Sequence, residues 1–131
     1  MINQFSLDRI LLVDDEPDIR LIAQRALESV GGFTVRPCTD GEDALSKIEA
    51  FDPQLILMDV MMPGKDGPTT MAELRKIKHF SRVPIVFITA RVQKTEVEEY
   101  LAQGASEVIS KPFNPMTLSS QIQKVWSESQ E

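Results

Sequence analysis

Polar residues that could act on a phosphate group or hold a metal ion stand directly after strand-like runs in this sequence. They are Asp14 and Asp15 after residues 9–13, Asp59 after residues 55–58, Thr89 after residues 84–88, and Lys111 after residues 107–110. Continuous apolar runs of this length are typical of strands buried on both faces. Because parallel strands end at the same edge of a sheet, we expect the five side chains to gather there.

Three carboxylates brought together repel one another, and a hard divalent cation is the simplest remedy. Mg²⁺ prefers oxygen ligands, so Asp14, Asp15 and Asp59 suit it better than they suit zinc. A carboxylate beside such an ion can attack a phosphoryl group, because the cation neutralises the repulsion between the reactants. Lys111 could then pair with one phosphate oxygen, and the Thr89 hydroxyl could donate to another.

Each of these residues also has an ordinary structural interpretation. An aspartate after a strand is often a turn former, and a lysine before a proline is often solvated. Threonine is favoured in strands for its branched side chain alone. The functional interpretation therefore rests on the combination of these residues at successive strand ends.

The elements that must position these residues alternate along the chain. Strands are predicted at residues 9–13, 33–38, 55–59, 84–88 and 107–110. Helices are predicted to start near Pro17, Asp40, Pro68, Thr95 and Asn114–Pro115, with a capping box between Thr95 and Glu98. Five strands, each followed by a helix, predict an α/β fold: an open, doubly wound parallel sheet covered on both faces.

The sequence predicts which face of the first and last helices packs on the core, and which strand lies at the edge of the sheet. In the first helix, the residues predicted to face the core are Ile19, Ile22, Ala23, Ala26, Leu27 and Val30. In the last helix they are Leu118, Ile122, Val125 and Trp126. Pro37, inside the second strand, predicts that this strand lies at a sheet edge.

Composition limits the class of protein. The 131 residues fit one domain, expected at residues 8–127 with short tails at 1–7 and 128–131. Fourteen basic against twenty acidic residues, with no basic cluster, argue against direct binding of nucleic acid. The sequence has no signal peptide and no apolar stretch of ~20 residues, so we expect no membrane insertion and a cytoplasmic location. A single cysteine, Cys38, excludes an internal disulfide and fits a reducing compartment.

The chain from about Arg9 to Trp126 resembles the receiver domain of response regulators in two-component signalling. The resemblance is carried by the Asp14-Asp15 pair, by Asp59 followed by Met-Met-Pro-Gly-Lys-Asp-Gly, by Thr89-Ala90, and by Lys111-Pro112-Phe113. It implies a five-stranded, flavodoxin-like (βα)5 fold with strand order 2-1-3-4-5. It also implies a stand-alone, single-domain regulator.

The resemblance assigns a role to each acid. Asp59 is expected to be the phosphoacceptor, forming an aspartyl phosphate. Asp15, Asp59 and the backbone carbonyl of Met61 are expected to bind Mg²⁺ directly, with Mn²⁺ as a substitute, and Asp14 to hold the ion through water. Self-catalysed phosphoryl transfer and autodephosphorylation are then the only chemistry expected, so the chain is not predicted to be an enzyme.

The resemblance also describes how phosphorylation is reported. Thr89 and Lys111 are expected to bind the phosphoryl oxygens, and the Lys111–Pro112 bond is expected to be cis. One residue departs from the family pattern: receivers commonly carry Tyr or Phe three residues before the lysine, and this chain has Val108. Valine has no comparable rotamer switch, so the signal is expected to pass through backbone shifts or Tyr100.

The leading hypothesis for function is a phosphorylation switch served by a sensor histidine kinase or a histidine phosphotransfer protein. Its output would be contact with a downstream protein, at the face formed by the fourth helix, fifth strand and last helix, or onward transfer in a phosphorelay. One alternative is a magnesium-dependent phosphohydrolase, although Met61 stands where such enzymes place a second aspartate as acid/base. The other alternative is a docking module that is never phosphorylated.

Overall fold

Strands and helices alternate along the chain in the computed structural model, which describes residues 6–131. Residues 1–5, part of the expected N-terminal tail, lie outside the described residues. The strands are β1 (Arg9–Val13), β2 (Thr34–Cys38), β3 (Leu55–Asp59), β4 (Ile85–Thr89) and β5 (Glu107–Ser110). The helices are α1 (Pro17–Arg25), α2 (Gly41–Phe51), α3 (Gly67–Arg75), α4 (Lys94–Ala102) and α5 (Leu118–Ser129). This alternation confirms the predicted α/β class.

The five strands form one parallel sheet in the order β2-β1-β3-β4-β5, which confirms the expected strand order. Pro37 lies in the edge strand β2, as predicted. The register keeps the strand ends level through these pairs: Val13 with Met58, Asp59 with Ile88, and Thr89 with Ser110. The polar residues at or just after the strand ends therefore meet at one edge of the sheet.

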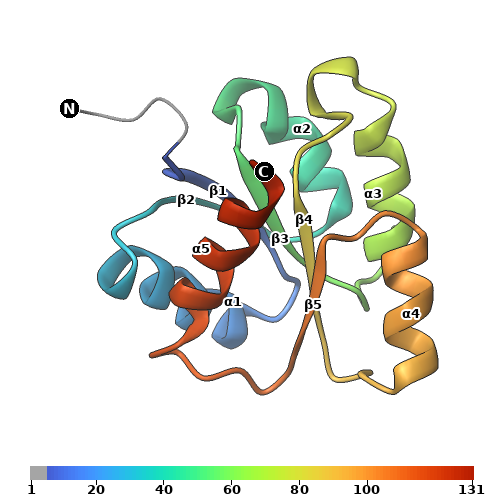
Figure 1. Cartoon of the computed structure of the whole chain (residues 1–131). Coiled ribbons are helices and arrows are strands. Elements are labelled where there is room, and N and C mark those ends of the chain that lie inside the picture. Colours follow the sequence, from blue (N-terminus) through green and yellow to red (C-terminus); the bar gives the residue numbers. More distant parts are fainter. Residues whose placement is uncertain (1–5) are drawn as a thin grey trace.

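Helices cover both faces of the sheet, with α1 and α5 on one face and α2, α3 and α4 on the other (Figure 1). Successive strand residues point to opposite faces. Leu57 packs under α1 and α5, whereas its neighbours Ile56 and Met58 pack on the side of α2 and α3. Every residue of β3 and β4 is buried, and each buried aliphatic side chain contributes about 1.5–3 kcal/mol. The burial of β3 and β4 thus holds Asp59 and Thr89, the last residues of these strands, in fixed positions.

The last helix starts later than predicted. It begins at Leu118, and a turn over residues 115–117 stands where the first turn of the helix was expected. Asn114 stabilises this turn, because its side-chain oxygen accepts from the Met116 amide at 2.9 Å and its carbonyl accepts from the Leu118 amide at 3.0 Å. The predicted inner face is correct: Leu118, Ile122, Val125 and Trp126 are all buried.

The inner face of the first helix is narrower than predicted. Ala23, Ala26 and Leu27 are buried, but Ile22 and Val30 are 45% and 48% exposed. The helix changes character at its end, since α1 gives way to a π-helical turn over Ala26–Val30. A π turn is wider than an α turn and shifts the angular position of the residues in it. The turn meets α5, where the Ser119 hydroxyl donates to the Ala26 carbonyl at 3.1 Å.

The helix starts were predicted in part. Asp40 caps α2 as expected, accepting from the Asp43 amide at 2.8 Å. The capping box between Thr95 and Glu98 is wrong, because α4 begins at Lys94 after Gln93 and has no side-chain cap. Thr95 and Glu98 have the spacing of a capping box. Thr95 already lies inside the helix, however, one residue after its first residue Lys94, so it is not the N-cap residue.

The folded domain extends slightly beyond the expected boundaries of residues 8 and 127. Leu7, which precedes the expected boundary, is buried in the core, and α5 runs to Ser129. Within residues 6–131, the structure has no helix of the length and apolar character needed to cross a membrane.

Candidate functional site

Three carboxylates gather at the carboxyl ends of β1 and β3. Asp14 and Asp59 are buried and Asp15 is half-buried, and the three offer oxygen atoms that all lie within 4.8 Å of one another. The Asp15 Oδ1 atom is shielded from solvent and has no hydrogen-bond partner among the described residues. Buried acceptors are nearly always satisfied, and an all-oxygen donor set suits a hard cation such as Mg²⁺. The cluster therefore has the chemistry of a metal site.

The backbone around β1 explains how Asp14 is placed. Its amide donates to the Cys38 carbonyl at 3.1 Å, which extends the pairing of β1 with β2 by one residue. Its side-chain Oδ1 accepts from the Glu16 amide at 2.9 Å, and its carbonyl accepts from the Arg20 side chain at 2.7 Å. Asp14 is thus fixed by hydrogen bonds to β2 on one side and to Glu16 and Arg20, at the start of α1, on the other.

Lys111 joins the strand ends into one site. Its amide donates to the Thr89 carbonyl at 2.8 Å, and the Lys111–Pro112 peptide bond is cis, as the family resemblance implied. Its Nζ atom lies 3.2 Å from Asp59 Oδ2, 3.1 Å from Asp14 Oδ2 and 3.0 Å from Glu16 Oε1. One ammonium group therefore faces three carboxylates.

Glu16 was not predicted as part of the site. Its side chain is 57% exposed, yet it is the carboxylate closest to the Lys111 ammonium. The available signal was the unbroken acidic run Asp14-Asp15-Glu16, of which we had assigned roles to only the first two residues. Its contact with Lys111 spans 95 positions of sequence, so sequence spacing could not show it.

Burial and nearby charges shift the pKa values of Asp14 and Asp59. Burial, and then the charge of Asp14, raises the pKa of Asp59 to about 6, although Lys111 and the Met61 amide act in the opposite direction. Burial also raises the pKa of Asp14, opposed by the Glu16 amide and Lys111. Burial by itself would lower the pKa of Lys111, but its bonds to Glu16 and Asp14 and the charges of Asp14 and Asp59 raise it. The single cation leaves the negative charge of the cluster only partly compensated.

Thr89 and Met61, two further residues with expected roles, follow the strands next to Asp59: Met61 comes two residues after the end of β3, and Thr89 ends β4. Thr89 is buried at the end of β4, beside β3, and its Oγ1 accepts from the Arg91 amide at 3.0 Å. Within the described residues, no hydrogen bond joins the Thr89 hydroxyl to the three acids. The Met61 backbone amide acts to lower the pKa of Asp59, whereas the Met61 side chain is 55% exposed.

Gly67 allows the loop after β3 to fold back against the site. A Cβ atom at this position would lie 2.7 Å from the Asp59 carbonyl oxygen and 2.9 Å from the Val60 Cα. Both neighbours are backbone atoms and cannot move aside easily. The Gly67 amide donates to the Val60 carbonyl at 2.8 Å, which closes the loop. Local sequence does not show this close approach, because it depends on the folded chain.

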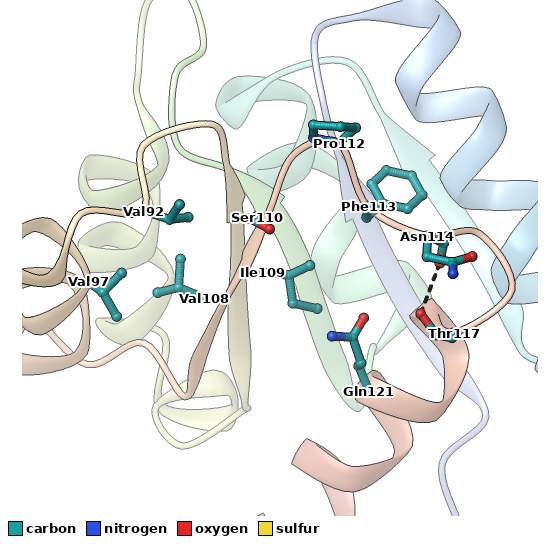
Figure 2. A pocket seen from close by; sticks show the side chains of 10 residues that line it. All are labelled: Val92, Val97, Val108, Ile109, Ser110, Pro112, Phe113, Asn114, Thr117 and Gln121. Atoms are coloured by element: carbon teal, nitrogen blue, oxygen red, sulfur yellow. Dashed lines mark hydrogen bonds between the residues drawn. The ribbon is translucent and has the colours of Figure 1, made fainter.

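A cavity of about 390 Å³ lies between α4, β5 and the start of α5. Figure 2 shows Val92, Val97 and Val108 on one side of it and Asn114, Thr117 and Gln121 on the other. None of the acids, Thr89 or Lys111 lines it. Ser110 and Pro112, the two neighbours of Lys111, do line it, so the cavity wall includes the backbone on both sides of Lys111.

A (βα)5 sheet with an acid cluster and a lysine at its strand ends defines the class of CheY-like receiver folds. Residues 10–123 match the sequence family described as the response regulator receiver domain, and the chain belongs to this family. It is similar to the chemotaxis protein CheY4 of Vibrio cholerae, with a TM-score of 0.85 and 31% identity over 92% of this chain and 99% of that one.

Two curated relatives are longer proteins. The response regulator Rre1 of Synechocystis sp. is 33% identical over 92% of this chain and 52% of its own length. The alkaline phosphatase synthesis transcriptional regulatory protein PhoP of Bacillus subtilis is 35% identical over 93% of this chain and 50% of its own length. The chain thus spans about half the length of these curated relatives.

Proposed function

We propose that this domain is a phosphorylation switch in which Asp59 accepts a phosphoryl group from a phosphohistidine. The donor would be a sensor histidine kinase or a histidine phosphotransfer protein, and the cytoplasm would be the place of the reaction. The observation that carries the proposal is the Lys111 ammonium, 3.2 Å from Asp59 Oδ2 within a cluster of three acids. Such an arrangement suits a carboxylate that must receive a negatively charged group.

In the proposed transfer step, the chain supplies the nucleophile and the donor supplies the leaving group. An ionised Asp59 oxygen attacks phosphorus, the phosphorus–nitrogen bond of the donor breaks, and the imidazole leaves with the bonding electrons and takes up a proton. With a pKa of about 6, Asp59 is mostly ionised above neutral pH and is ready to act as the nucleophile. Lys111 can follow the new phosphoryl oxygen by a small movement of its ammonium, and Thr89 can donate to another oxygen.

The acid cluster would hold Mg²⁺ through Asp15, Asp59 and the Met61 carbonyl, with Asp14 binding through water. Mn²⁺ would occupy the same ligands. When bound, the ion neutralises charge between the carboxylates and the incoming phosphoryl group. The unpaired, buried Asp15 Oδ1 supports this assignment, because nothing in the described chain satisfies it.

A signalling role fits the site better than hydrolysis of an external substrate. The Met61 side chain is apolar and exposed, and it cannot exchange a proton with a leaving group. The chemistry proposed for this chain is therefore confined to its own phosphorylation and dephosphorylation.

The output face is proposed at α4, β5 and α5. The cavity in Figure 2 supports this choice, because it is lined from all three elements and shares backbone with Lys111. Val108 occupies the wall where other receivers carry an aromatic ring. Tyr100 of α4 packs edge-on against Phe87 of β4, with ring centroids 5.6 Å apart, which gives a route from β4 to α4 that does not use Val108.

Incubation with acetyl phosphate and Mg²⁺ tests the proposal. We expect intact-mass spectrometry to show the addition of one phosphoryl group to the wild type, and none to Asp59→Asn or in excess EDTA. Asp40→Asn is the matched control, because it makes the same change at a helix cap and asparagine caps as well as aspartate. No addition to the wild type would favour a docking module, and labelling of Asp59→Asn would place the phosphoacceptor elsewhere.

A further inference from the structure

The loop between β3 and α3, residues 60–66, holds the Met61 backbone beside Asp59. Its ends are tied together, since the Gly67 amide donates to the Val60 carbonyl at 2.8 Å. Asp66 caps α3 by accepting from the Thr69 amide at 2.9 Å. Between these points Met62 anchors the apolar side of the loop, because its side chain is buried in the core under α2 and α3.

Lys65 ties the polar side of the same loop to two helices. Its Nζ atom lies 2.8 Å from both carboxylate oxygens of Glu73 in α3 and 3.2 Å from Glu42 Oε1 in α2. The Lys65 stem is packed as well: a Cβ atom at Gly41 would lie 3.1 Å from the Lys65 Cβ. The lysine therefore bridges the start of α2, the loop and the last turn of α3.

We propose that Lys65 is a positioning residue, whose ion pairs with Glu73 and Glu42 hold the loop so that the Met61 backbone stays beside Asp59. The part of this inference that concerns Mg²⁺ rests on the proposed function, because Met61 is a proposed ligand. The part that concerns the loop is a property of the metal-free chain and stands independently.

The two ion pairs of Lys65 are expected to differ in strength. Both oxygens of Glu73 face the ammonium and the Glu73 side chain is 36% exposed, whereas Glu42 offers one oxygen and is 72% exposed. Charge-assisted bonds weaken as water gains access to them. Loss of Glu73 should therefore loosen the loop more than loss of Glu42.

Hydrogen exchange of the metal-free protein, followed by mass spectrometry, measures the loop directly. In Lys65→Met, which keeps the stem and removes the ammonium, we expect exchange of the Gly67 amide, which closes the loop through its bond to the Val60 carbonyl, to be about 3- to 10-fold faster. Glu73→Gln should show a similar increase, Glu42→Gln a smaller one, and Lys65→Arg nearly none. Lys94→Met is the matched control, because Lys94 forms only a long, exposed pair with Glu98 at 3.9 Å on α4.

Calorimetric titration with Mg²⁺, without any phosphodonor, measures the consequence for the site. Removal of a positive charge strengthens cation binding through long-range electrostatics, whereas loss of the loop tie weakens it. We expect the weakening to prevail, so Lys65→Met should raise the Kd for Mg²⁺ about 2- to 5-fold. The sign of this change thus separates positioning from a general charge effect.

The outcomes decide the two proposals separately. Faster exchange of the Gly67 amide in Lys65→Met and Glu73→Gln, with Lys94→Met unchanged, supports the role of Lys65. Unchanged exchange in both variants, or tighter Mg²⁺ binding by Lys65→Met, would overturn it. If the wild type itself shows no Mg²⁺ binding, the proposed metal site fails, while the exchange data still decide whether Lys65 holds the loop.

Discussion

Removing the charge of Asp59 should make the metal-free protein more stable. Burial and the charge of Asp14 raise the pKa of Asp59 from 3.8 to about 6. The folded state therefore binds the Asp59 proton more tightly than the unfolded state does, and stability is lost as the pH rises through this range. Asp59→Asn is neutral and fills nearly the same volume, so the variant avoids this loss. Lys111 keeps Asp14 and Glu16 as partners.

The size of the effect follows from the two pKa values. Ionisation of Asp59 costs the folded state about 0.6 kcal/mol at pH 4 and about 3 kcal/mol at pH 7.5, relative to the unfolded chain. Losing one of the three contacts of Lys111 offsets part of this gain. We therefore expect Asp59→Asn to raise the free energy of unfolding by about 2 kcal/mol at pH 7.5, and by much less at pH 4.

Urea denaturation in EDTA, at several pH values between 4 and 7.5, measures this difference. Asp40→Asn controls for the chemical change, because its side chain caps α2 away from the Lys111 cluster. A gain in Asp59→Asn that does not depend on pH would come from packing instead of charge. A variant no more stable than the wild type at pH 7.5 would refute the reasoning.

Three further predictions concern the site and its surroundings. Addition of Mg²⁺ or Mn²⁺ should stabilise the wild type by about 2.7 kcal/mol at 100 times the Kd and Asp59→Asn far less, measured by urea denaturation; equal stabilisation of both would mean that the ion binds elsewhere. Gly67→Ala should lower the free energy of unfolding by about 1–3 kcal/mol, because its Cβ would meet the Asp59 carbonyl at 2.7 Å, and an unchanged urea midpoint would contradict this close approach. Tyr100→Ala should reduce the phosphorylation-dependent change in partner binding, measured by affinity capture with and without acetyl phosphate; a change as large as that of the wild type would exclude Tyr100 from the route.

Much of the fold could be predicted from local patterns. The apolar run before Asp59 indicates a strand buried on both faces, and β3 is buried at every position. Pro37 indicates an edge strand, and β2 is one. Two of the predictions that failed concern helix starts: the turn at Asn114 and the start of α4 at Lys94 depend on backbone bonds that differ little in energy between alternatives.

The sequence alone determined that acids, a hydroxyl and a lysine stand at successive strand ends, because period and strand length follow from neighbouring residues. Only the tertiary structure decided how these groups meet. The bond between Lys111 and Glu16 joins residues 95 positions apart. The close approach of Gly67 to the Asp59 carbonyl and the reach of Lys65 to both Glu73 and Glu42 likewise depend on how separate elements pack. Side-chain contacts between elements are set by distances in three dimensions, and no spacing along the chain encodes them.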